Sequence, residues 1–64
     1  MSRADVIRSH AAQKRETADA LERDAVFCDN GGQRSAYKDE AAQLRTQATN
    51  LDTQASELEA QEGN

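Results

Sequence analysis

The feature that most constrains this sequence is a pair of heptad repeats, one in each half of the chain. In the first half the repeat passes through Ala4, Ile7, Ala11, Lys14, Ala18, Leu21, Ala25 and Cys28. In the second half it passes through Tyr37, Ala41, Leu44, Ala48, Leu51, Ala55 and Leu58. Steps of three and four residues are typical of the contact line of a coiled coil. Both halves are therefore predicted to be helices that pack along these lines.

The two contact lines fit together when the chain folds back on itself near its middle. Head-to-tail pairing sets Ala18 against Leu44, and in every facing pair the two residue numbers add up to 62. All seven layers then oppose an alanine to a larger side chain, which lets helices pack closely without voids. We predict an all-α fold, an antiparallel two-helix hairpin of the coiled-coil type, forming a single domain over residues 1–64.

The expected helix ends follow from capping residues and glycines. Ser2 can cap the first helix, and Asp5 three residues later completes a sequence typical of a capping box. Asparagine and the double glycine at 29–32 suit the left-handed backbone that ends a helix. Ser35 is the candidate cap of the second helix. The expected elements are a helix at 3–28, a turn at 29–34 and a helix at 35–61.

The charges support this pairing of the two ends. The first quarter of the chain carries Arg3, Arg8, Lys14 and Arg15, and the last quarter carries Asp52, Glu57, Glu59 and Glu62. An antiparallel hairpin lays these two segments side by side, which disfavours other pairings. The acidic residues Glu16, Asp19, Glu22 and Asp24 alternate with Arg15 and Arg23 at helical spacing. This alternation predicts ion pairs within the first helix.

Alanine on one side of the contact line and leucine on the other, in two helices joined by a short turn, resembles the Rop family of small plasmid RNA-binding regulators. The resemblance covers nearly the whole chain as a pattern, the alanine-seam or Alacoil pattern, and matches no RNA-contacting residue of that family. It implies that two hairpins associate into a four-helix bundle or a larger oligomer. Lys14 departs from the pattern, because it occupies the middle of the seven layers, where two copies would bring like charges together.

Length and composition exclude several classes of protein. A chain of 64 residues buries little surface alone and usually needs a staple or a partner. One cysteine and one histidine predict neither an internal disulfide nor a metal site. No catalytic motif is present, so we expect no enzyme activity and no cofactor. The lack of a long apolar run and the unpaired Cys28 predict a protein that stays in the cytoplasm, without membrane contact.

Lys14 and Phe27 each allow more than one interpretation. The Lys14 ammonium can reach outward to solvent, or the residue can select the register or a partner. Phe27 can fold over the turn, or it can serve as an exposed anchor for another chain. Val6, Ala20 and Phe27 share a second, weaker apolar stripe on the first helix, which suggests that this helix meets a partner. The candidate interface comprises Val6, Lys14, Ala20, Val26, Phe27 and Tyr37.

These features favour a small, non-enzymatic protein–protein interaction module. Its expected partners are further copies of itself and another protein, for which it would act as adaptor, regulator or inhibitor. Small helical accessory proteins of bacteria and phages have similar size and composition. The alternative is an RNA-binding regulator that uses the basic edge of the first helix, with Arg8, Lys14 and Arg15 as the contacts. A net charge of −4 makes general attraction to nucleic acid weak.

Overall fold

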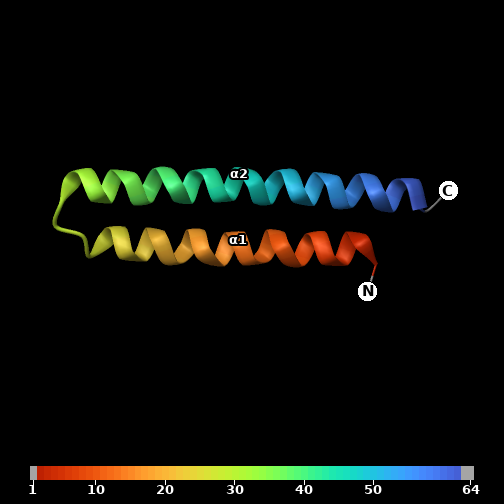
Figure 1. The fold of residues 1–64 in the computed structure, drawn as a ribbon, viewed down its shortest axis with the longest axis horizontal. Coiled ribbons are helices and arrows are strands. Elements are labelled where there is room, and N and C mark those ends of the chain that lie inside the picture. The colour runs from red at the N-terminus through yellow and green to blue at the C-terminus, as the bar shows by residue number, and fades with distance from the viewer. Residues whose placement is uncertain (1, 63–64) are drawn as a thin grey trace.

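The chain forms two long helices that pack side by side and run in opposite directions (Figure 1). The computed structural model describes residues 2–62. Helix α1 spans Arg3–Val26 and helix α2 spans Gly31–Glu62, and the start of α1 lies at the same end of the molecule as the end of α2. The hairpin measures 52 × 16 × 10 Å. The prediction of an all-helical fold with two helices packed against each other is confirmed.

The fully buried core of the described chain consists of alanines alone. Ala4, Ala11, Ala18 and Ala25 of α1 and Ala41, Ala48 and Ala55 of α2 all have 0% exposure. They are the small residues of the predicted seam, and they recur every seven residues because this spacing returns to the same side of a helix. The short side chain of the alanine in each layer leaves room for the larger residue opposite it, which allows the two helices to pack closely along the hairpin.

The start of α1 follows the predicted capping box. The Ser2 hydroxyl accepts a hydrogen bond from the Asp5 amide at 3.1 Å, and the Ser2 amide donates to the Asp5 carboxylate at 3.4 Å. Two amides that a helix leaves without partners at its first turn are satisfied in this way.

The predicted turn at 29–34 is too long, and Ser35 is not the cap of α2. The helix begins at Gly31, where the Asn30 side-chain oxygen accepts from the amides of Gly32 at 2.9 Å and Gln33 at 3.2 Å. Asn30 is therefore the cap of α2, and Ser35 lies within its second turn. Helix α1 ends two residues earlier than predicted, at Val26, because its last turn tightens.

The glycines do not supply a left-handed backbone. Within residues 2–62 no residue, glycine or other, has a positive φ. Helix α1 instead ends through tight bonds from the Phe27 amide to the Asp24 carbonyl and from the Cys28 amide to the Ala25 carbonyl, both at 3.2 Å. Such three-residue steps satisfy the last carbonyls of a helix without a left-handed residue.

Candidate interaction surface

The hairpin presents two chemically different long faces on either side of the alanine seam. The larger residues of the contact lines lie on one side of the alanine seam. The residue that comes directly after each of them in the sequence lies about 100° further round the helix, on the opposite side of the seam. We call the first side the open face. It comprises Ile7, Lys14, Leu21 and Cys28 of α1 and Tyr37, Leu44, Leu51 and Leu58 of α2. All eight are only half-buried, so this face keeps apolar surface in contact with water.

Lys14 is the single charged residue of the open face, and it lies at the middle of it. Its ammonium group donates to the side-chain oxygen of Gln47 on α2 at 2.9 Å, and the residue is half-buried. His10 and Thr17, one turn away on either side along α1, line a hollow beside it together with Gln13, Leu44 and Leu51. A neutral amide is thus the only hydrogen-bond partner of this ammonium within residues 2–62.

The opposite side of the seam, which we call the ion-pair face, comprises Arg8, Arg15 and Glu22 of α1 and Arg45, Asp52 and Glu59 of α2. Arg8 donates to Glu59, and Arg15 pairs with Asp52 at 2.6 Å. The two pairs lie seven residues apart on each helix, so they repeat with the period of the seam. The prediction that the basic start of α1 lies beside the acidic end of α2 is confirmed for these pairs.

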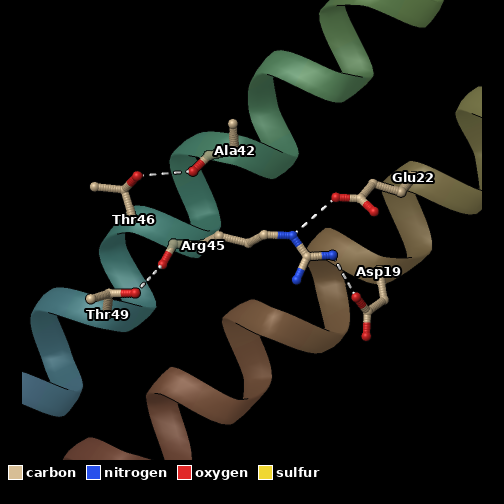
Figure 2. Close-up of polar contacts among 6 residues, drawn as sticks. All are labelled: Asp19, Glu22, Ala42, Arg45, Thr46 and Thr49. Atoms are coloured by element: carbon tan, nitrogen blue, oxygen red, sulfur yellow. Dashed lines mark hydrogen bonds and ion pairs between the residues drawn. The ribbon is translucent and has the colours of Figure 1, made fainter.

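Arg45 of α2 forms the third connection of the ion-pair face (Figure 2). The prediction that Asp19 and Glu22 form ion pairs within the first helix is wrong, because both pair with Arg45. Its guanidinium group lies 2.7 Å from the Asp19 carboxylate and 3.0 Å from that of Glu22. Asp19 and Glu22 therefore pair across the hairpin, because a fork of donors from α2 reaches both carboxylates at once. Hydrogen bonding to Glu22 and then to Asp19 raises the pKa of Arg45.

The pair between Arg8 and Glu59 predicts a loss of stability in acid. The hydrogen bond from Arg8 lowers the pKa of Glu59 below its ordinary value of 4.5. Because the folded pKa is the lower one, the contribution is complete above the unfolded value and disappears as the pH falls through the folded value. We expect the difference in unfolding free energy between the native protein and Glu59→Gln to shrink between about pH 5 and pH 3.

Urea unfolding followed by circular dichroism at several pH values measures this difference. Glu57→Gln is the matched control, because Glu57 is exposed and makes no ion pair in the described chain. A difference for Glu59→Gln that stays constant across the acid range would show that the pair does not act in solution.

The turn is held by Arg34, which the sequence analysis did not single out. Its guanidinium group donates to the Ala25 carbonyl at 3.2 Å and to the Cys28 carbonyl at 2.6 Å. The Ala25 carbonyl also accepts from the Cys28 amide. Carbonyls at the end of a helix carry partial negative charge, so a cation placed there is favourable. Arg34 therefore joins the first turn of α2 to the end of α1.

The candidate interface residues do not form one patch. Val6, Val26 and Phe27 are exposed, at 41%, 74% and 84%. Phe27 therefore does not fold over the turn. Lys14 and Tyr37 belong to the open face, and Ala20 is half-buried on α1. Val26 lies apart from these, beside the ion-pair residues Asp19 and Glu22 and near Arg23.

The residues of the nucleic-acid alternative are engaged within the hairpin. Arg8 and Arg15 each pair with a carboxylate of α2, and Lys14 lies on the open face with Gln47. Paired guanidinium groups present a neutral surface to a phosphate backbone, which requires unpaired cations.

Histidine, cysteine and carboxylate side chains do not gather into a group of three or more suited to a metal ion within residues 2–62. The Cys28 thiol contacts the Asn30 carbonyl at 3.6 Å and the Gln33 side-chain oxygen at 3.4 Å. Neither α1 nor α2 combines the length and apolar character needed to cross a membrane.

Comparison of the sequence with models of protein families and with curated proteins, and of the fold with solved structures, gives no match.

Proposed function

We propose that this protein is a non-enzymatic protein–protein interaction module that binds through its open face. It associates with further copies of itself, forming a four-helix bundle or a larger oligomer, and acts on a larger partner as adaptor, regulator or inhibitor. The observation that carries the proposal is the contrast between the two faces. The charges of the ion-pair face satisfy one another, whereas the open face leaves half-buried leucines in water.

The small core supports the need for a partner. Seven buried alanines remove little apolar surface from water, because their side chains are small. Each buried methyl group stabilises the fold by only about 0.8 kcal/mol. Ordering two long helices costs about 1–2 kcal/mol of backbone entropy for each residue. Covering the open face buries the remaining surface of Leu21, Leu44 and Leu51, and so adds apolar burial where the isolated hairpin has little.

Sedimentation equilibrium over a range of concentrations tests the proposal. We expect the native chain to form dimers or larger particles, and we expect Leu44→Gln to raise the dissociation constant at least tenfold, or about 1.4 kcal/mol. Each copy contributes its own Leu44, so the loss of apolar contact counts twice.

Val26→Gln is the matched control, because Val26 is a more exposed apolar residue away from the open face. We expect it to leave the dissociation constant unchanged. An effect of Val26→Gln with none of Leu44→Gln would move the interface to the other face. A monomer at millimolar concentration would remove self-association and leave binding to a foreign protein to be tested by capture.

A further inference from the structure

We propose that a second copy of this chain covers the open face in antiparallel orientation, one heptad short of full overlap. In this register Asp24 of each copy meets Lys14 of the other. The inference rests on the proposed function and specifies its occupant and register. It starts from a single observation, the lone ammonium group in the middle of a face whose other members carry no charge.

Full overlap of two antiparallel copies is disfavoured by Lys14. The two-fold axis would then pass level with Lys14 on α1, and the two ammonium groups would approach each other inside the interface. Full overlap also places Arg3 beside Asp24 of the second copy, a favourable contact at the exposed rim. Exposed pairs contribute little, whereas desolvated like charges are strongly unfavourable, so the lysines decide against this register.

A shift of one heptad towards the turn removes the like-charge contact and keeps the layers aligned. The axis then passes level with Leu44, which faces Leu44 of the second copy. Tyr37 faces Leu51, and Leu21 covers the aliphatic stem of Lys14. Seven residues is the repeat of both contact lines, so this shift again places larger seam residues opposite one another.

The shifted register also supplies the missing counter-charge. Asp24 lies one turn beyond Leu21 on α1, is exposed, and makes no ion pair in the described chain. In the second copy it comes level with the stretch between His10 and Lys14, beside the hollow that these residues line. Lys14 then exchanges a neutral amide partner for a carboxylate, and the two-fold axis makes the same contact twice.

The exposed aromatic residue finds a place in the same arrangement. Phe27 of the second copy lies within one helical turn of Val6, so two of the exposed apolar side chains come together. Under full overlap Phe27 would lie beyond the start of α1, with nothing to cover it.

The area is sufficient for a stable dimer. The shift of seven residues shortens the overlap of the two copies by about 10 Å. The hairpin is 52 Å long and 16 Å wide. The remaining face offers roughly 650 Å² on each copy, or about 1,300 Å² in total, within the range of specific interfaces.

Charge reversal tests the register. We expect Lys14→Glu and Asp24→Lys each to raise the dissociation constant of the dimer at least tenfold, measured by sedimentation equilibrium. The double variant should return it to within about threefold of the native value, because the contact is restored with opposite signs. Lys38→Glu and Glu16→Lys make the same charge changes at exposed positions outside the interface, and are expected to have no such effect. Circular dichroism confirms that each variant is folded.

Three outcomes overturn the inference. A double variant as weak as the single variants, in a protein whose native form dimerises, excludes this register and leaves the proposed function standing. Full overlap is assigned instead if the double variant Arg3→Asp and Asp24→Arg restores the native dissociation constant and Lys14→Met dimerises more tightly than the native chain. A native chain that stays monomeric removes both the inference and the self-association part of the proposed function.

Discussion

Replacing Ala18 by leucine is expected to lower the unfolding free energy of the hairpin by about 1–3 kcal/mol. Ala18 is completely buried, and the antiparallel register sets it against Leu44 of α2. A leucine there adds three carbon atoms where no space exists, so the helices must separate locally. Separation loosens the neighbouring alanine layers and lengthens the ion pairs of Arg45.

Urea unfolding followed by circular dichroism measures the loss, and Ala12→Leu is the matched control. Ala12 belongs to the same helix and is exposed, so the same substitution there tests helix propensity and solubility without overpacking. Leucine is a good helix former, and we expect the control to stay within about 0.5 kcal/mol of the native protein. Equal stability of the Ala18 and Ala12 variants would contradict a closely packed seam.

The seam could be predicted from the sequence because periodicity is a property of the helix itself. A residue every seven positions returns to the same side whatever the rest of the chain does, and all seven predicted alanines are indeed buried. The contact between the basic start of α1 and the acidic end of α2 followed from the antiparallel direction alone, and the pair between Arg8 and Glu59 is one instance of it. These predictions depended on backbone geometry and on chain direction, not on the conformation of any one side chain.

The turn was predicted less well because several residues compete for each role. Asn30 and Ser35 are both good helix caps, and the choice between them depends on where the seam places the first turn of α2. Glycine has poor helix propensity, which favoured a longer turn. An alanine Cβ at Gly31 would nevertheless meet nothing within 4 Å, so the helical backbone there is unhindered and the Asn30 cap decides the boundary.

Arg45 was missed for a related reason. A long side chain on a helix reaches both its own helix and the neighbouring one. Spacing alone therefore left Asp19 and Glu22 free to be assigned to Arg15 or Arg23 of α1. The hairpin places the Arg45 guanidinium group between the two carboxylates (Figure 2). Two charge-assisted bonds from one side chain outweigh a single exposed pair within a helix.

Replacing Arg34 by methionine is expected to lower the unfolding free energy by about 2 kcal/mol. Methionine keeps most of the apolar stem and removes the donors that hold the carbonyls of Ala25 and Cys28. Hydrogen bonds from a charged donor contribute about 1.5–3 kcal/mol each, and exposure of Arg34 to solvent reduces this value. The favourable interaction with the end of α1 is lost as well.

Lys38→Met provides the control, because Lys38 is an exposed base one turn further along α2 without a hydrogen bond in the described residues. We expect the control to change the unfolding free energy by less than about 0.5 kcal/mol. Arg34→Lys separates charge from geometry, since an ammonium group keeps the charge and lacks the planar fork. A lysine variant as stable as the native protein would assign the effect to the helix dipole, whereas a loss close to that of methionine assigns it to the paired donors. The second result is expected, because the two carbonyls belong to residues three positions apart and one fork spans both.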